Sequence, residues 1–211
     1  MTTLALFGGS GRTGRLVLDE ALAAGYTVRV LARRATSIAQ TSPSLTVIEG
    51  DVLDPAAVGR TLDGSDAVIS VFGQVKGSSP TLQADGTRII TEGMRKRGIR
   101  RIVTLSGGGL PYPEQDRPKV PDRLIRFLLQ RISGHVLADA EAHLEVLKAS
   151  GLDWTVVRGP VLTDAPKTGA YRVGWVGVNA GTRIGRADLA EFILGQVDDT
   201  RFVHQLPFVS T

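Results

Sequence analysis

Residues Gly8-Gly9-Ser10-Gly11-Arg12-Thr13-Gly14 stand between two apolar stretches, Thr3-Leu4-Ala5-Leu6-Phe7 before them and Arg15-Leu16-Val17-Leu18-Asp19-Glu20-Ala21-Leu22 after them. The first stretch has the length of a β-strand, and the second carries its apolar residues at helical spacing. Gly25 follows where the C-cap glycine of a helix belongs. This part of the chain therefore predicts a strand, a tight glycine turn and a helix in succession.

Three glycines of the turn, Gly8, Gly11 and Gly14, are spaced by two residues. In such a turn one glycine makes the tight bend, one lets backbone N–H groups approach a pyrophosphate, and one lets the helix pack closely on the strand. The amides of the first helical turn and the positive end of the helix dipole then hold the phosphate charge. The pattern predicts a dinucleotide site; the alternative is a turn that binds no ligand.

Length and composition exclude several other kinds of protein. The 211 residues are within reach of one α/β domain, and the absence of cysteine excludes disulfides, thiolate catalysis and cysteine zinc sites. The three histidines, His135, His143 and His204, match no metal motif, so we expect no metal. A net charge of +4 can steer an anionic ligand but does not by itself indicate nucleic acid, which we do not expect as a partner.

No segment has the pattern of a targeting signal or a membrane span. The apolar N-terminal residues give way to glycine too early for a signal peptide, and the apolar run at 124–129 is interrupted by Arg126. We therefore expect a cytoplasmic protein with no membrane partner.

Two arginines end the second predicted strand, Tyr26 to Ala32, which is rich in β-branched residues. A site that prefers NAD has a carboxylate roughly 20 residues after the glycine turn, where it binds the ribose hydroxyls. No Asp or Glu occurs between Glu20 and Glu49, and Arg33 and Arg34 occupy that position instead. Because guanidinium groups match a 2′-phosphate, we expect NADP(H) to be preferred over NAD(H). The alternative is that both arginines are solvated loop charges.

Further strands and helices alternate along the chain. Strands are expected at 45–49, 66–73, 101–106 and 152–157, and helices from Asp54-Pro55, over 81–97 and over 136–149. This alternation predicts an α/β fold of the Rossmann type, a doubly wound, mostly parallel sheet with helices on both faces. We expect a single domain over 1–211, in which about 107–135 and 159–211 form the substrate-side lid and C-terminal elements.

The second half of the chain contains less regular elements. Residues 111–121 form a proline-rich, charged loop that we expect to act as a flap, and 123–132 form an amphipathic helix that packs on its own domain or offers a partner surface. A short strand is expected over 169–173, a helix over 188–197 with Asp188 as its N-cap, and a last strand over 202–209. We interpret the basic run Arg95-Lys96-Arg97 as a solvated helix end.

With these motifs in this order, the chain resembles the atypical short-chain dehydrogenase/reductases of the NAD(P)H-binding, NmrA-like kind, above all their biliverdin-IX-beta reductase/flavin reductase branch. The matching motifs are the glycine turn, Gly50-Asp51-Val52-Leu53, Ser150-Gly151-Leu152, Thr168-Gly169-Ala170-Tyr171 and Ile184-Gly185-Arg186-Ala187-Asp188-Leu189-Ala190. They cover nearly the whole chain. The resemblance implies a Rossmann fold, NADPH and a small planar acceptor such as a flavin, a quinone or a tetrapyrrole.

The resemblance also implies roles for single residues. Arg12 and Thr13 would hold the pyrophosphate and Arg33 the 2′-phosphate. The segment Asp51-Val52 would flank the adenine, Val71 to Gly73 the ribose, and Ser106 with Arg158 to Val161 the nicotinamide. The expected cofactor-binding residues are thus Gly8, Ser10, Gly11, Arg12, Thr13, Gly14, Arg33, Arg34, Asp51, Val52, Val71, Phe72, Gly73, Ser106, Gly107, Arg158, Gly159, Pro160 and Val161.

The catalytic tyrosine–lysine pair of the wider superfamily is absent. That pair has a lysine four residues after a tyrosine, whereas Val30, Asp116 and Trp175 follow the three tyrosines at that spacing. The branch also carries a serine just after the fifth strand and a histidine after the sixth, and here Gly107 and Pro160 stand at those positions. Catalysis by a side-chain acid is therefore not supported.

Ser106 is the best remaining polar candidate for catalysis, as a hydrogen-bond donor to the substrate or to the nicotinamide amide. The alternative is a strand-end serine that is bound to backbone. His135 and His143 are candidate acids by residue type alone, and we expect both on a solvated helix surface.

Three functions fit these observations. We favour an NADPH-dependent reductase of a small aromatic or planar substrate, because hydride transfer to an electron-poor ring can take its proton from water. A redox sensor of the NmrA-like kind, which binds NADP(H) and a protein partner without turnover, fits the missing tyrosine–lysine pair equally well. A carbonyl or sugar-nucleotide dehydrogenase is disfavoured by the same absence. For the assembly we expect a monomer or a homodimer.

Overall fold

The computed structural model describes residues 2–75 and 77–211, with all their side chains except those of 121–130, 132 and 133. The strands are β1 (Thr3–Phe7), β2 (Thr27–Ala32), β3 (Leu45–Glu49), β4 (Ala67–Ser70), β5 (Arg101–Gly107), β6 (Asp153–Gly159), β7 (Val161–Thr163), β8 (Arg172–Gly174), β9 (Arg183–Gly185) and β10 (Phe208–Ser210). The helices are α1 (Arg12–Ala23), the short 3₁₀ helix η1 (Ala35–Ser37), α2 (Pro55–Leu62), α3 (Leu82–Lys96), α4 (Val120–Ala149) and α5 (Arg186–Gly195).

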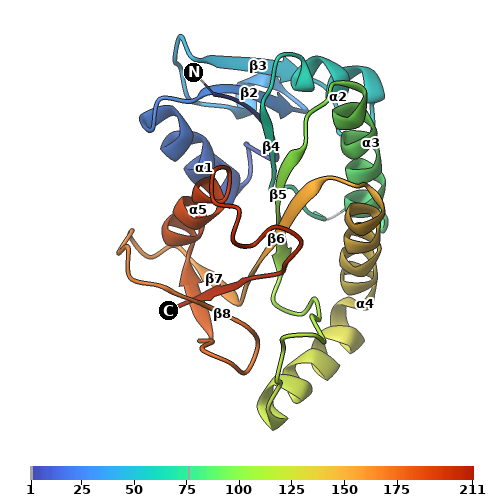
Figure 1. Cartoon of the computed structure of the whole chain (residues 1–211), viewed down its shortest axis with the longest axis vertical. Helices are drawn as coiled ribbons and strands as arrows, with labels where there is room; N and C mark the ends of the chain where they lie inside the picture. Colours follow the sequence, from blue (N-terminus) through green and yellow to red (C-terminus); the bar gives the residue numbers. More distant parts are fainter. Residues whose placement is uncertain (1, 76) are drawn as a thin grey trace.

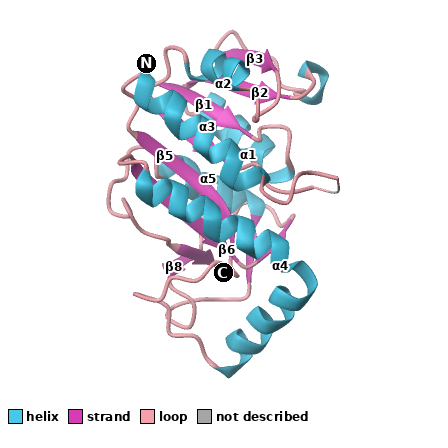
Figure 2. Cartoon of the chain, turned by 90° about the vertical axis from the view of Figure 1, so that its right-hand side faces the viewer, coloured by secondary structure: helices cyan, strands magenta, loops and turns pink. Residues whose placement is uncertain are grey.

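The central sheet has the strand order β3-β2-β1-β4-β5-β6-β10-β8, and its strands are parallel except for β8, which is antiparallel to β10. Helices α1 and α5 cover one face, and α2, α3 and α4 cover the other (Figures 1 and 2). The predicted α/β Rossmann-type fold is confirmed. The strand order reverses between β1 and β4, which is where open parallel sheets bind their ligands.

The sheet is apolar on both faces because its strands bury side chains on both. In β1, Leu4 and Leu6 belong to the core beneath α1 and α5, whereas Ala5 and Phe7 belong to the core beneath α2, α3 and α4. Such continuous apolar strands are typical of parallel sheets covered by helices. The start of α2 follows its sequence signal: Asp54 caps the helix by accepting a hydrogen bond of 2.9 Å from the backbone N–H of Ala56.

Helix α4 corrects the expectation of two separate helices over 123–132 and 136–149. It is one helix of 30 residues, with Gly134 inside it. An interior glycine weakens a helix by only about 1 kcal/mol, which is too little to end one that packs on a core. The first half of α4 extends away from the sheet (Figure 2). The apolar stripe expected at 124–132 lies outside the described side chains. Within the described residues, no helix combines the length and hydropathy of a membrane span.

The C-terminal elements differ from the sequence prediction in two respects. The last strand contains only Phe208–Ser210, because the chain turns at 201–204, where His204 has φ 60°. Helix α5 has Gly185 as its N-cap, so Asp188 lies in the first turn and is not the N-cap. Its carboxylate instead accepts hydrogen bonds of 2.8–2.9 Å from Thr168 and Gly169. Burial opposes the charge, but these hydrogen bonds hold the pKa of Asp188 below its ordinary value.

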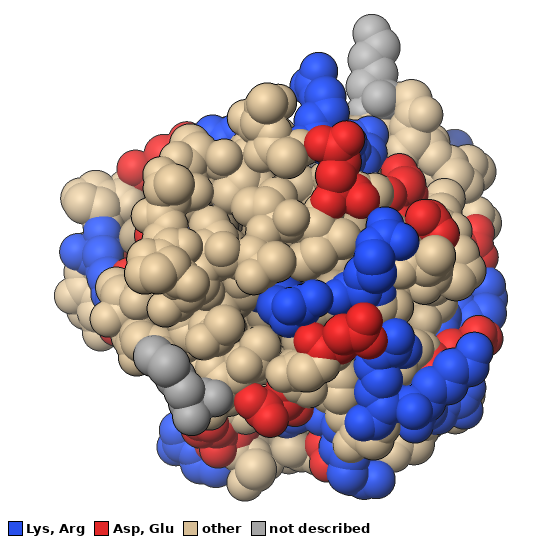
Figure 3. All heavy atoms as spheres, turned by 90° about the horizontal axis from the view of Figure 1, so that it is seen from above, with Lys and Arg blue, Asp and Glu red and all other residues tan. Residues whose placement is uncertain are grey.

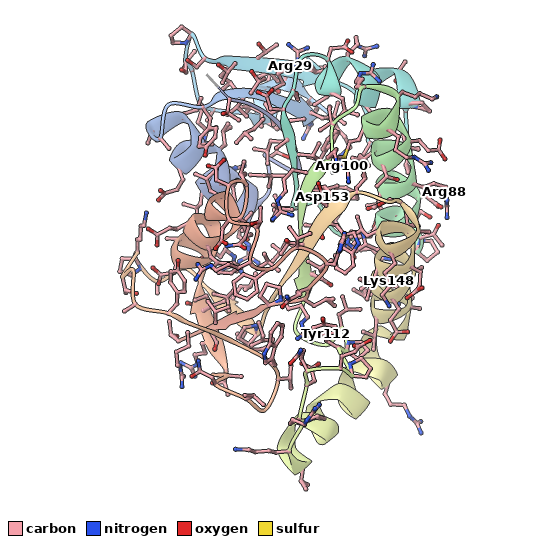
Figure 4. The ribbon with its side chains drawn as sticks, viewed as in Figure 1. Arg29, Arg88, Arg100, Tyr112, Lys148 and Asp153 are labelled. Carbon is pink, nitrogen blue, oxygen red and sulfur yellow. The ribbon has the colours of Figure 1, made fainter. Side chains whose placement is uncertain are left out.

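The basic residues at the end of α3 and the start of β5 take part in contacts within the fold. Arg97 forms a 2.8 Å ion pair with Asp63. Arg101 donates to the backbone carbonyl of Gln196, and Arg100 pairs with Asp153 at 3.1 Å (Figure 4). Figure 3 shows acidic side chains interspersed among the basic ones over this side of the molecule. The local charge is therefore mixed rather than uniformly positive.

Arg158 on β6 is fully buried, and its guanidinium makes four hydrogen bonds. Its guanidinium donates two bonds of 2.8 Å to the carboxylate of Asp116 and further bonds to the carbonyls of Leu110 and Leu206. The rings of Tyr112 and Phe208 lie 5.8 Å from its Cζ. A guanidinium enclosed in this way cannot reach a ligand, so the expected contact of Arg158 with the nicotinamide would come from its backbone.

Asp116 connects the proline-rich loop at 111–119 to β6 and to the segment after β8 through hydrogen bonds. Besides Arg158, its carboxylate accepts hydrogen bonds from the backbone N–H groups of Tyr112 and Val176, at 2.8 and 3.0 Å. The loop therefore bridges β6 and the segment after β8. We expected a flap here; the loop is anchored at its middle.

We predict that Arg158→Met lowers the free energy of unfolding by about 3–5 kcal/mol, because it leaves the buried carboxylate of Asp116 without its partner. The matched control is Arg100→Met, which breaks the exposed pair with Asp153 and should cost less than about 1 kcal/mol. Urea denaturation followed by circular dichroism measures both. Equal losses in the two variants would contradict the assigned role of Arg158.

Candidate active site

The glycine turn follows β1 and is packed against the segment after β4. Gly8 has φ +89°, and a Cβ on it would lie 2.5 Å from the backbone N of Phe72. A Cβ on Gly14 would overlap the carbonyl of Gly8. Both positions therefore require glycine for contacts inside the protein, as the turn and helix-packing roles demand.

Gly11 is under less steric constraint than Gly8 and Gly14. A Cβ on it would meet only the carbonyl of Gly8, at 3.3 Å, and its φ is −74°. It is the N-cap of α1, which has no side-chain cap and no acidic residue in its first turn. This helix end therefore has backbone N–H groups and a positive dipole end without an internal partner, an arrangement that suits a phosphate.

The other residues expected at the pyrophosphate surround this helix end. Ser10 is half-buried, and Thr13 is buried in the first turn of α1. Arg12 is exposed and lies 3.9 Å from Asp164, the residue after β7. The same carboxylate forms a shorter ion pair of 2.5 Å with Arg186, at the start of α5. Arg12 is therefore free to leave Asp164 for an anion at low cost, because exposed ion pairs contribute little.

Arg33 and Arg34 follow β2 directly, and both are exposed. Neither side chain has a hydrogen bond or ion pair within the described residues. Glu49, at the end of β3, lies beside this segment because β3 pairs with β2 in parallel, Ala32 opposite Glu49. Its carboxylate accepts a 2.8 Å hydrogen bond from the backbone N–H of Ala35. The sequence prediction considered carboxylates on the second strand alone and missed Glu49, which the strand register supplies.

The segments expected beside the adenine and the ribose are Asp51-Val52 after β3 and Val71-Phe72-Gly73 after β4. Helix α3 brings them together at Gly86, where an added Cβ would lie 3.2 Å from Val52 Cγ2 and 2.8 Å from Phe72 Cζ. Asp51 is exposed and accepts a 2.9 Å hydrogen bond from the N–H of Leu53. An added Cβ on Gly73 would meet no atom within 4 Å, so open space lies over this residue. Gly86 has no sequence signal beyond being a glycine within a helix.

Ser106 lies near the end of β5 and has a buried hydroxyl without a partner. The residue is 6% exposed, and its Oγ makes no hydrogen bond to any described residue. Buried polar atoms are nearly always hydrogen-bonded, so an unpartnered one at a strand end indicates a group that a ligand can satisfy. The alternative, a strand-end serine bound to backbone, does not hold among the described residues.

The residues beyond Ser106 are small and lie where the paired strands β5 and β6 end. Gly107 is exposed and pairs with Gly159 across β5 and β6. After Gly159, Pro160 is half-buried and Val161 is 66% exposed. An added Cβ on Gly107 would meet no atom within 4 Å, so open space lies over this residue, whereas one on Gly159 would lie 3.1 Å from Leu162 Cδ2. The exposed side chain of Val161 makes this edge apolar, which suits a ring better than a charged group.

His143 corrects the expectation of a solvated histidine. It is 2% exposed, and its ring nitrogens lie 2.8 Å from the hydroxyl of Thr87 on α3 and 3.2 Å from that of Thr104 on β5. Burial lowers the pKa of His143 to about 4, against a partly opposing effect of Asp139. A neutral imidazole fixed between two threonines is a structural link between α3, α4 and β5. His135, on the same helix, is exposed as expected.

The tyrosines do not provide a catalytic acid of the superfamily kind. The hydroxyl of Tyr26 donates to Asp198 at 2.8 Å, the ring of Tyr112 packs edge-on against Trp175, and the ring of Tyr171 packs edge-on against Phe192. Burial raises the pKa of all three. The described residues also contain no group of three His, Asp or Glu that could hold a metal ion.

Comparison with known proteins places this geometry among nucleotide-binding proteins. A family model described as NAD(P)H-binding matches residues 8–200. Among curated relatives, the Bacillus subtilis protein YwnB is 22% identical over 208 residues, 92% of each chain. Cinnamoyl-CoA reductase 2 of Arabidopsis thaliana is 27% identical over 180 residues, 75% of this chain and 54% of that protein. The chain spans 60% and 45% of the lengths of two other curated relatives, from Arabidopsis thaliana and Sinorhizobium fredii.

Solved structures with low sequence identity share the fold. A short-chain dehydrogenase/reductase from Veillonella parvula in complex with NADP superposes with a TM-score of 0.81 at 18% identity, over 100% of this chain and 94% of that one. ChuY of Escherichia coli O157:H7, described as an anaerobilin reductase, has a TM-score of 0.77 at 20% identity, over 99% of this chain and 97% of its own.

We predict that the stability of the protein falls between pH 6.5 and 4 in part through His143. The unfolded state takes up a proton near pH 6.5, whereas the folded state resists protonation down to a pKa of about 4. This difference should remove about 2 kcal/mol at pH 5 relative to pH 8. In urea denaturation at the two pH values, His143→Gln should lose less stability on acidification than the wild type. His135→Gln is the control and should behave as the wild type; identical pH dependence in all three would disprove the role of His143.

Proposed function

The chain belongs to the NAD(P)H-binding family, and from this premise we propose that it is an NADPH-dependent oxidoreductase that transfers a hydride to a small planar acceptor of the flavin, quinone or tetrapyrrole type. The observation that carries this proposal is the buried, unpartnered hydroxyl of Ser106 at the same sheet edge as the glycine turn. This hydroxyl lies at the end of a different strand from the phosphate-binding turn, where the nicotinamide end of the dinucleotide or the acceptor would lie. The hydroxyl therefore supports a role for the edge between β5 and β6 in holding reacting rings.

The fit of NADPH to the chain rests on three observations. The first turn of α1 has no internal cap and can take the pyrophosphate. Arg33 and Arg34 are exposed without described partners and suit the 2′-phosphate. Open space over Gly73 leaves room for the ribose. The preference for NADP(H) over NAD(H) rests on the two arginines, while Glu49 lies close enough to weaken it.

In this mechanism the bound cofactor supplies a hydride from C4 of its nicotinamide. The chain's own residues bind and orient: Ser106 donates a hydrogen bond to the nicotinamide amide or to the acceptor, and the backbone of 159–161 borders the ring. The exposed apolar side chain of Val161 would exclude water from one side of that ring. No described tyrosine has a lowered pKa, and His143 is satisfied by two threonines, so the proton comes from solvent.

The acceptor side of the site consists, in this proposal, of about 107–135 and 159–211 within one domain over 1–211. The anchored loop around Asp116 and the segment after β8 lie together there. A second function, an NADP(H)-binding redox sensor of the NmrA-like kind, is favoured by the lack of any described side chain placed to donate a proton. In either function the protein acts as a monomer or a homodimer in the cytoplasm.

We predict that the purified protein oxidises NADPH above background in the presence of at least one of FMN, riboflavin, menadione or biliverdin. Absorbance at 340 nm under steady-state conditions measures the rate, and Ser106→Ala should lower it because the variant removes the hydroxyl donor. A control without acceptor corrects for slow oxidation by oxygen. Tight NADPH binding with no turnover by any acceptor would favour the sensor and contradict the reductase.

We predict that Arg33→Ala weakens NADPH binding by roughly 1–3 kcal/mol and leaves NADH binding unchanged, because only NADPH carries the 2′-phosphate that the guanidinium binds. Isothermal titration calorimetry with both cofactors measures the change. Arg95→Ala removes an exposed positive charge at the end of α3 and serves as the control for net charge. An equal loss for NADPH and NADH in Arg33→Ala would remove Arg33 from the 2′-phosphate site.

A further inference from the structure

Asp139 on α4 is a buried carboxylate with no cationic partner among the described residues. It is 3% exposed, and its two oxygens accept three hydrogen bonds from neutral donors. Two come from the backbone N–H groups of Gln83 and Ala84, at 2.9 and 3.0 Å, in the first turn of α3. The third comes from the side-chain amide of Gln74, at 2.7 Å. One carboxylate thus caps a helix of another part of the chain and holds a loop residue.

Hydrogen bonds that depend on Asp139 reach the residues on both sides of Gly73. This glycine follows β4 at the carboxyl-end edge of the sheet, where a ligand is expected. On one side Gln74 is held directly by Asp139. On the other side, the side-chain amide of Gln83 donates a 3.3 Å hydrogen bond to the carbonyl of Phe72. The backbone N–H of the same Gln83 donates to Asp139. The side chain of Gln74 and the carbonyl of Phe72, one on each side of Gly73, are therefore both linked to one buried carboxylate.

The same contact closes the loop between β4 and α3. The amide of Gln74 also donates a 2.6 Å hydrogen bond to the carbonyl of Pro80, so the two ends of the loop meet at Asp139. Ser78 binds the backbone N–H and carbonyl of Val75 within the loop. Without the carboxylate, Gln74 would keep only one of its two acceptors, and the first amides of α3 would lose their partner.

We propose that Asp139 is a positioning residue for the cofactor, holding Phe72-Gly73-Gln74 in the conformation that accepts NADPH. The proposal rests on the proposed function, because it assumes that this segment borders the bound cofactor. Asp139 itself is enclosed and touches no ligand. Its effect is to order the segment in advance, which reduces the entropy lost when a ligand binds.

The test compares Asp139→Asn with Asp85→Asn. Both changes remove one negative charge near the start of α3. Asp85 is half-buried, and its hydrogen bonds go to Thr81 and Arg88, not to the residues on either side of Gly73. An asparagine at 139 cannot accept from all three donors, because its NH₂ group replaces one acceptor oxygen and would face at least one of the donors with its own hydrogens. We expect Asp139→Asn to raise the dissociation constant for NADPH about tenfold. We expect Asp85→Asn to change it less than about twofold.

A second readout separates positioning from general loss of stability. With FMN as acceptor and saturating NADPH, kcat of Asp139→Asn should stay near that of the wild type while KM for NADPH rises. A merely destabilised protein would lose active molecules, so kcat would fall and KM would not change. Equal NADPH affinity in the Asp139 and Asp85 variants would overturn the proposal.

Gln74→Leu provides a variant that leaves the cap of α3 intact. It removes only the hydrogen bond between Gln74 and Asp139. We expect it to raise the dissociation constant for NADPH, by a smaller factor than Asp139→Asn does. If Asp139→Asn does not fold, an unchanged affinity in Gln74→Leu overturns the proposal. Calorimetry on the wild type tests the proposed function separately. If the wild type gives no heat with NADPH, the cofactor assignment is wrong. If the wild type binds NADPH and the variants bind it equally well, only the role of Asp139 is wrong.

Discussion

The close approach of backbone at Gly8, Gly14 and Phe72 is the constraint on which the site depends. A Cβ at Gly8 would press on the backbone of Phe72, and one at Gly14 on the carbonyl of Gly8, so only glycine lets α1 begin directly above the end of β1. The contact also joins β1 to the segment after β4, the two strands between which the strand order reverses. The uncapped end of α1 is thereby placed at the switch point of the sheet, where a charged ligand meets amides and a helix dipole together.

The rest of the site contains several buried polar groups. Whether such a group is fully hydrogen-bonded within the protein separates the structural residues from those that can bind a ligand. Arg158 is enclosed by a carboxylate, two carbonyls and two rings, and it holds the loop after β5 in place through Leu110 and Asp116. His143 is satisfied by two threonines and Asp139 by three donors. The hydroxyl of Ser106 alone among these groups lacks a partner within the described residues. A buried polar group that is fully bonded stabilises the fold, whereas an unbonded one is available to a ligand.

Several features of the site could be predicted from local sequence because they depend on neighbours in the chain. The glycine turn, the cap at Asp54 and the arginines after the second strand are each defined by a few consecutive residues. Glu49, Asp116 and Gly86 could not be found in this way. Glu49 comes beside Ala35 through strand register, Asp116 reaches Arg158 across 42 residues, and Gly86 joins Val52 to Phe72 through helix packing.

The sequence by itself determined the α/β class, the alternation of strands and helices in the first half of the chain and the glycine turn, because hydrophobic periodicity and glycine spacing are local properties. It also determined that no cysteine chemistry and no tyrosine–lysine pair exist. Only the tertiary structure decided that Arg158 and His143 are enclosed and that one long helix replaces two. Burial and hydrogen-bond partners depend on residues distant in the chain, so the same arginine or histidine can be solvated, structural or ligand-binding according to what packs against it.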